Sequence, residues 1–357
     1  MTIAKTIAGR LRPQKLSTVA LVYLALAGIL LIGALVVAAH GENLFSTANL
    51  VYLLTRSSLL GFVAIGQTLV IICRSLDLSV GYVVALSSLV AATTMAGDAS
   101  RIPLAIGAVI VVSASIGLVN GLVITKLKVN AFITTLGVGL IIKGYLDTRY
   151  KGPAGSVPEV FQSFGYTRIG FVPLSTLVML AVAVAAVVLL RKTRTGYHMF
   201  AVGGDSEVAR MSGVRTDRTV IVAHCLCAVG AGLAGLLVAA RFGTGSALVY
   251  SSGYDLESIA AVVLGGTYLL GGRGGVGGTV AGVMILAVLD TVFNILAVDP
   301  FFKDVLRGVI IIAAVAIYAR RQLSAKAQRI RFPTGAGRPP SDAAQAAPVA
   351  VNLGVGR

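Results

Sequence analysis

The sequence predicts an all-α polytopic membrane protein with about ten transmembrane helices. Of its 357 residues, 56% are hydrophobic and only 12% are charged, whereas soluble domains carry roughly 25% charged residues. Apolar runs of about 20 residues, the length needed to cross a hydrocarbon core of about 30 Å, follow one another along the chain. The 42 glycines, some spaced as in Gly117-Leu-Val-Asn-Gly121 and Gly278-Thr-Val-Ala-Gly282, indicate close helix packing in lipid.

Apolar length and helix-breaking residues place the helices in order. The first run is too long for the apolar region of a signal peptide, so we expect it to be retained, and the eighth is short for a full span. The expected helices cover residues 17–39, 48–72, 80–96, 103–125, 131–147, 172–190, 219–240, 255–270, 276–298 and 303–319. They predict a transmembrane domain at 17–320, a short cytoplasmic segment at 1–16 and a disordered basic cytoplasmic tail at 321–357.

The net charge of +16 follows the expected topology. Most of the 30 Lys and Arg residues fall in the two terminal segments and in the loops on their side of the membrane. By the positive-inside rule both termini are therefore expected to be cytoplasmic. These residues orient the helices and meet anionic lipid, and no basic groove interleaved with aromatic residues predicts a nucleic-acid partner.

The stretch Cys73-Arg-Ser-Leu-Asp-Leu-Ser-Val-Gly81 places polar residues between two long apolar runs. A helix start leaves unpaired N–H groups and a partial positive charge, which an aspartate satisfies well as an N-cap. We therefore expect Asp77 to cap the third span, with Ser79 and Gly81 beside it. Because polar backbone at membrane depth is tolerated where it faces protein or water, Asp77 has two open roles, a cap and a place on a transport route.

Residues 75–86 are echoed by residues 253–264, which match them at four of twelve positions and pair Asp77 with Asp255. Asp255 is then expected to cap the eighth span, with Glu257 close by, and Asn130 opens the fifth span where Asp299 opens the tenth. An offset of five spans turns the copies opposite ways across the membrane. The echo thus predicts an inverted-topology repeat over spans 2–5 and 7–10, with chance similarity of apolar sequence as the alternative.

A glycine-rich motif and the cysteines have simple explanations. Gly272-Arg273-Gly274-Gly-Val-Gly277 matches the dinucleotide fingerprint, but that fingerprint needs a preceding strand and a βαβ unit, so a tight cytoplasmic turn fits better. The three cysteines are expected to be small buried hydrophobic residues, and the three histidines are too far apart in sequence to argue for a metal site. No Walker A motif occurs, so we expect no bound cofactor and no ATP bound by this chain itself.

The loop 191–218 is the most informative cytoplasmic segment. Asp205 or Ser206 can cap a helix of about two turns, with Glu207 favourable in its first turn and Gly213 suited to end it. Because so short a helix is not stable alone in water, it needs a docking partner. That partner is either the rest of this protein or another protein.

These segments resemble the permease subunits of bacterial ABC importers for monosaccharides, the family of the ribose permease. The resemblance covers residues 45–320 and rests on 77–81, 129–137, 203–214 and 265–279. It implies a multi-pass protein of the bacterial inner membrane that forms a homodimer, a separate cytoplasmic ATPase subunit and a periplasmic sugar-binding protein. The permease itself would then be a transport subunit and not an enzyme.

The resemblance also assigns site residues. The segment Glu207-Val-Ala209 followed by Gly213 is similar to the E-A-A-x-x-x-G coupling loop, which the family seats in a groove on the ATPase. The expected coupling residues are Gly203, Gly204, Asp205, Glu207, Ala209, Arg210 and Gly213. The candidate helix-junction or pathway residues are Asp77, Ser79, Gly81, Asn130, Asp255 and Glu257, and the Gly-rich turn holds Gly272, Arg273, Gly274 and Gly277.

One departure and two alternatives accompany this reading. Arg74-Ser75 stand where the family usually has two glycines, so a backbone conformation open only to glycine would be strained there. A related branch imports branched-chain amino acids, although Asp-Leu-Ser-Val-Gly at 77–81 favours the sugar branch. The alternative from another class is an ion-coupled secondary transporter, which would need an intramembrane ionisable group such as Asp147 or Asp290.

Overall fold

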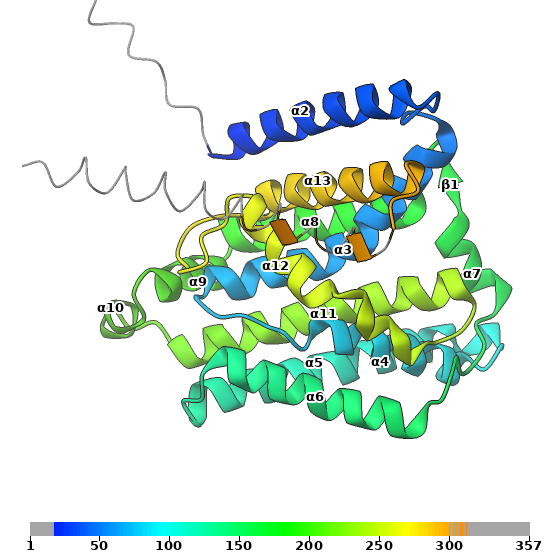
Figure 1. The fold of residues 1–357 in the computed structure, drawn as a ribbon. Helices are drawn as coiled ribbons and strands as arrows, with labels where there is room; N and C mark the ends of the chain where they lie inside the picture. Colours follow the sequence, from blue (N-terminus) through cyan, green and yellow to red (C-terminus); the bar gives the residue numbers. More distant parts are fainter. Residues whose placement is uncertain (1–17, 300, 303–304, 306–307, 310–311, 313–357) are drawn as a thin grey trace, which may run out of the picture. The chain divides into compact units, whose positions relative to one another are not determined.

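The computed structural model describes residues 18–299, 301–302, 305, 308–309 and 312, and they are mainly helical (Figure 1). Within this part of the chain, seven helices are long and apolar enough to cross a membrane. They are α2 (Thr18–Ala39), α3 (Thr47–Ile72), α5 (Ile102–Lys126), α6 (Ala131–Arg149), α8 (Leu174–Lys192), α11 (Thr216–Phe242) and α13 (Val276–Ile295). The prediction of an all-α polytopic membrane protein is confirmed.

Two of the expected spans are shorter helices. α4 (Val80–Met95) has 16 residues and α12 (Tyr254–Leu264) has 11, so α12 is too short to cross a core of about 30 Å. The expected helix at 255–270 ends early because the glycines after Leu264 turn the chain, with Gly266 at φ 84°. The expected span at 303–319 lies largely outside the described residues, as do the segments 1–16 and 321–357 entirely. The count of ten spans stays a prediction.

Short elements lie in the connections between the long helices, and of these the sequence predicts only α10. A 3-10 turn, η1 (Ala99–Arg101), precedes α5, and η2 (Ala247–Ser252) precedes α12. Between α6 and α8 lie α7 (Glu159–Tyr166) and a small antiparallel hairpin of β1 (Arg168–Ile169) and β2 (Val172–Pro173). Between α8 and α11 lie α9 (Arg194–Gly204) and α10 (Ser206–Met211). Apart from α9, these elements are too short to give a periodic hydrophobic pattern.

Helix α11 lies at the centre of the fold, packed against α3, α4 and α5 (Figure 1). Glycines make this approach close. A Cβ atom added to Gly117 of α5 would lie 2.4 Å from the backbone oxygen of His224, and one on Gly121 would lie 2.7 Å from the Cα of Ile221. The expected close packing at this Gly-x-x-x-Gly pair is therefore confirmed.

A second close contact joins α13 to α12. A Cβ on Gly278 would lie 2.0 Å from the oxygen of Gly265, and one on Gly282 would lie 2.1 Å from the oxygen of Ala261. α13 also packs against α2 and α3. The short helix α12 is thus attached to the bundle by backbone contacts with its successor, as the glycine spacing predicts.

The short helices α4 and α12 begin beside each other and run in opposite directions. A Cβ on Gly81 would lie 3.7 Å from the backbone nitrogen of Asp255. α4 runs toward the connection before α7, where the Gly97 N–H donates to the oxygen of Ser156 (2.9 Å). α12 runs toward α9 and α10, an end of the bundle that we call the α10 end (Figure 1). The two echoed segments therefore form helices of opposite direction, while the inverted repeat itself stays a prediction.

Candidate functional site

The segment 193–214 forms two consecutive helices that share Asp205 as the boundary. Asp205 ends α9, and its carboxylate then accepts the N–H groups of Glu207 (2.9 Å) and Val208 (3.1 Å) at the start of α10. α10 ends at Met211 with Ser212 as its C-cap, and the next residue, Gly213, has φ 83° and donates its N–H to the oxygen of Arg210. The predicted short helix, its Asp205 cap and its Gly213 terminus are confirmed. α9 was not expected, because glycines and polar residues hide its apolar face.

Helix α10 has two apolar side chains that point away from the helix bundle and are exposed. Met211 is 87% exposed and Val208 is 60% exposed, whereas Ala209 is buried against the bundle. Glu207 and Arg210 form an ion pair along the same exposed surface. Outward apolar residues framed by a charged pair are typical of a surface that binds a protein partner.

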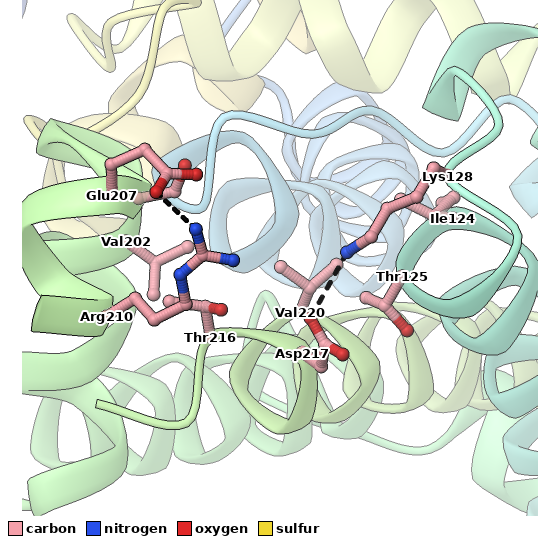
Figure 2. Close-up of a pocket in the computed structure, with 10 residues that line it drawn as sticks. Ile124, Thr125, Lys128, Val202, Glu207, Arg210, Thr216, Asp217 and Val220 are labelled. Carbon is pink, nitrogen blue, oxygen red and sulfur yellow. Dashed lines mark hydrogen bonds and ion pairs between the residues drawn. The ribbon is translucent and has the colours of Figure 1, made fainter. Parts of the chain in front are cut away.

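A pocket of about 180 Å³ lies between α10, the last turns of α5 and the first turn of α11 (Figure 2). Its apolar part consists of Ile124, Val202 and Val220. Its rim carries charge: the Glu207–Arg210 pair lies on one side and Asp217 on the other. The Asp217 carboxylate contacts the Lys126 amine at 2.8 Å and the Lys128 amine at 3.7 Å.

The connection between α3 and α4, residues 73–79, runs inward from the α10 end before α4 begins (Figure 1). Asp77 lies fully buried within it. One carboxylate oxygen accepts the N–H (2.9 Å) and the hydroxyl (2.5 Å) of Ser79, and the other lies 3.2 Å from Nδ1 of His224 and 3.3 Å from Nδ2 of Asn120. Asp77 is the centre of a buried hydrogen-bond network that ties the connection to α5 and α11.

The predicted capping roles of Asp77 and Asp255 are wrong. Ser79 occupies the N-cap position of α4, and Asp77 lies two residues earlier, bonded to the N–H of that cap residue. Asp255 lies inside the first turn of α12, behind an N-cap at Gly253. Besides Ser79, Asp77 has Asn120 of α5 and His224 of α11 as partners, and sequence spacing alone does not reveal these two.

Ser75, His224 and Asp77 together resemble a hydrolase triad but have no access to a substrate. The Ser75 hydroxyl lies 2.9 Å from Nε2 of His224, and Nδ1 of the same ring faces the Asp77 carboxylate. Because an ionised carboxylate only accepts, Nδ1 of His224 donates to Asp77, and Nε2 faces the Ser75 hydroxyl. All three residues are at most 6% exposed. The arrangement therefore fixes the connection and performs no nucleophilic chemistry.

A second buried cluster surrounds Arg56 of α3, near the start of α12. The guanidinium contacts the Glu257 carboxylate at 2.7 Å, the Asp290 carboxylate of α13 at 2.9 Å and the hydroxyl of Tyr254 at 3.1 Å. The Arg56 side chain is 15% exposed and that of Glu257 only 2%. Glu257 was predicted as a junction residue, but Arg56 was missed as its partner. The available signal was a lone arginine inside a predicted span.

The other predicted pathway residues have simple positions. Asn130 caps α6 by accepting the N–H of Phe132 at 2.8 Å. Gly81 lies at the start of α4 next to Asp255. Neither residue forms a hydrogen bond with Asp77 or Arg56.

The Gly-rich turn connects α12 to α13 through residues with left-handed backbone. Gly271, Gly272 and Gly274 have φ of 80°, 73° and 134°, values that side chains rarely adopt. Arg273 is exposed, and its oxygen accepts the N–H of Tyr268 (2.9 Å). The element directly before this turn is helix α12 and not a strand, so the motif is a turn and not a dinucleotide site.

Three of the predicted groups meet at the α10 end. The Gly272 N–H donates to the oxygen of Ile72, the last residue of α3, at 2.9 Å. Gly203, at the end of α9, packs directly on this bond. The coupling residues, the α3–α4 connection and the Gly-rich turn thus form one continuous structure.

The position expected to be strained is strained. Arg74 has φ 61°, the left-handed region that costs a residue with a side chain roughly 1–2 kcal/mol. Ser75 is not in this region, and its side chain is used by His224. Of the two positions where the family usually has glycine, only position 74 has a backbone conformation that favours glycine.

Comparisons with known proteins agree with these features. A family model described as "Branched-chain amino acid transport system / permease component" matches residues 49–315. The chain is 34% identical over 298 residues to the ribose import permease protein RbsC of Escherichia coli (strain K12), covering 82% of this chain and 92% of that protein.

Two further relatives are similar over the same extent. The galactose/methyl galactoside import permease protein MglC of Escherichia coli (strain K12) is 35% identical over 317 residues, covering 82% of this chain and 94% of that protein. The ribose import permease protein RbsC of Bacillus subtilis (strain 168) is 34% identical over 293 residues, covering 81% and 90%. No solved structure gives a significant match to the chain.

Proposed function

Because the chain belongs to this family of transport-system permease components, we propose that it is the membrane subunit of an ATP-driven ABC importer that moves a sugar into the cell. The observation that carries the proposal is an identity of about one third to ribose and galactose import permeases over four fifths of the chain. The chain is a transport subunit and not an enzyme. A separate ATPase subunit hydrolyses ATP, and this chain itself binds no cofactor.

The exposed surface of α10 is the proposed docking site for that ATPase. Val208 and Met211 offer apolar side chains outside the bundle, and the Glu207–Arg210 pair beside them adds directional charge. A helix of six residues does not persist alone in water, but here Asp205 and Gly213 fix both ends. The partner would therefore meet a preformed helix.

The other subunits and the membrane topology are proposed by analogy with the family. The proposed importer contains two copies of this permease in the bacterial inner membrane, with both termini cytoplasmic, and a periplasmic binding protein that delivers the sugar. The opposite directions of α4 and α12 support two inverted halves around a pathway. In this mechanism ATP binding closes the ATPase, and α9 and α10 move with it. The short helices α4 and α12, which begin near Asp77 and Arg56, then shift, so that the pathway opens to the other side of the membrane.

The two alternatives have less support. An ion-coupled transporter needs a carboxylate that takes up and releases the coupling ion, yet Asp290 contacts Arg56 at 2.9 Å and Asp147 contacts Lys143 at 2.6 Å. A branched-chain amino acid permease would fit the family description, but the relatives above carry the names of sugar permeases.

The test is purification of the tagged chain from its native membrane in mild detergent, with identification of what remains bound. We expect a soluble ATPase with Walker motifs to co-purify. Glu207→Arg should abolish this association and sugar uptake, whereas Glu159→Arg, in exposed α7, should preserve both. Normal uptake by Glu207→Arg would remove the docking assignment, and repeated recovery of the chain alone would contradict the function.

A further inference from the structure

At the α10 end, the backbones of three segments are in direct contact: the end of α9 at Gly203, the end of α3 at Ile72 and the Gly-rich turn at Gly272. A Cβ added to Gly203 would lie 1.7 Å from the oxygen of Ile72 and 2.5 Å from the nitrogen of Gly272. These two atoms are the acceptor and donor of one hydrogen bond. The Cα of Gly203 therefore covers the bond that joins the end of α3 to the Gly-rich turn.

Neighbouring glycines extend the contact. A Cβ on Gly272 would lie 2.9 Å from the Cα of Gly204, and one on Gly271 would lie 2.7 Å from the Cβ of Arg74 and 2.9 Å from the oxygen of Gly203. Because backbone atoms have no rotamers to absorb a displacement, contacts of this kind transmit movement more directly than flexible side chains do.

The two segments beneath Gly203 lead to the two short helices. Residues 73–79 continue into α4, and the Gly-rich turn is the end of α12 and the start of α13. Above Gly203, only Asp205 separates α9 from α10. The contact around Gly203 thus connects α10 to both short helices, whose N-termini lie beside each other.

The contact exists because the carbonyl of Ile72, at the end of α3, needs a hydrogen-bond partner outside the helix. The last carbonyls of a helix lack partners within the helix, and the Gly272 N–H satisfies that of Ile72. Only a residue without a side chain can lie over this bond. Gly203 is such a residue, and the adjacent Gly204 has nothing within 4 Å of an added Cβ.

We propose that Gly203 is a positioning residue through which α10 moves the α3–α4 connection and the Gly-rich turn together. The proposal rests on the proposed function, since it assumes that a partner ATPase moves α10. It adds that neither half of the pathway can respond without the other, because one contact serves both.

The test compares Gly203→Ala with the control Gly107→Ala in the full importer. Gly107 is an exposed residue of α5 outside the coupling residues, and a Cβ added there would meet nothing within 4 Å. We therefore expect Gly107→Ala to keep wild-type uptake. Gly203→Ala should still bind the ATPase and keep its basal ATP hydrolysis, while losing about tenfold in uptake and in stimulation of hydrolysis by the sugar-loaded binding protein. Equal uptake by the two variants, with the ATPase bound to both, would overturn the proposal. Failure of the wild-type chain to bind any ATPase would instead overturn the proposed function.

A second measurement covers the case in which Gly203→Ala does not fold. Amide hydrogen exchange in the wild-type complex, with and without a non-hydrolysable ATP analogue, should change in parallel for peptides covering 199–206, 70–79 and 268–276. A peptide from the middle of α5 is the control and should not change. A change at 199–206 that leaves either of the other two segments unaffected would overturn the proposal.

Discussion

The two short helices that begin side by side are held by opposite charges. At the start of α4, the buried carboxylate of Asp77 accepts hydrogen bonds from Ser79, Asn120 and His224. At the start of α12, the buried guanidinium of Arg56 contacts two carboxylates. Each charge satisfies the requirement that a charged group inside a membrane bundle has partners.

Residues at matching positions of the two echoed segments therefore have different chemical roles. The sequence echo pairs Asp77 with Asp255, but Asp255 is partly exposed in the first turn of α12. The buried charge at α12 comes instead from α3. If the halves descend from one ancestor, their junctions have been stabilised by different residues.

The largest expected effect is at the Arg56 cluster. Arg56→Met removes the guanidinium that the carboxylates of Glu257 and Asp290 contact, and breaking a buried ion pair from one side costs about 3–5 kcal/mol. We expect this loss in the free energy of unfolding, measured by denaturant titration in detergent micelles. Lys143→Met is the control, because the Lys143–Asp147 pair is partly exposed and such pairs contribute little. Equal losses for the two variants would show that burial does not distinguish the clusters.

A somewhat smaller effect is expected at Asp77. Asp77→Ala leaves Ser79, Asn120 and His224 without their common acceptor, and buried polar groups without partners cost about 1–3 kcal/mol each. We expect a loss of about 3 kcal/mol, with the thermal unfolding midpoint in detergent falling accordingly. Asp255→Ala, at the echoed position, should leave the midpoint nearly unchanged. If Asp255→Ala lowered the midpoint as much as Asp77→Ala, the two aspartates would have equivalent roles, as the sequence echo suggests.

The smallest effect is at the strained position. Arg74→Gly relieves a left-handed conformation but adds the entropy cost of glycine, so we expect a net stabilisation of less than about 1 kcal/mol. Ser75→Gly loses the bond to His224 and should destabilise by about 1 kcal/mol. Differential scanning fluorimetry of the two variants side by side measures the sign. Destabilisation by Arg74→Gly would mean that the arginine side chain contributes more than its backbone strain costs.

Sequence patterns predicted the parts of this molecule that depend on local physics. Apolar length placed α2, α3, α5, α6, α8, α11 and α13 close to their true bounds, because hydrophobic matching to the bilayer is a property of each segment alone. Asp205 and Gly213 predicted α10 because capping acts over three or four residues. Gly117 and Gly278 indicated close packing for a similarly local reason.

The rest depended on contacts between distant segments. Two of the partners of Asp77, Asn120 and His224, lie 43 and 147 positions away, and Arg56 is about 200 positions from Glu257. Spacing along the chain cannot reveal such pairs, so the sequence predicts only a capping or pathway role for Asp77 and no partner for Arg56. The sequence overestimates the length of α12, because the apolar run continues past Leu264 through glycines that turn the backbone and end the helix.

ATP-driven sugar import by this permease is measurable as transport by purified components in proteoliposomes. The permease is reconstituted with its co-purifying ATPase and the sugar-loaded binding protein, with and without ATP on the ATPase side. We predict sugar uptake that needs ATP and continues when proton and sodium gradients are collapsed by ionophores. Uptake by the permease alone that follows an imposed proton or sodium gradient, and is lost in Asp290→Asn, would contradict the claim.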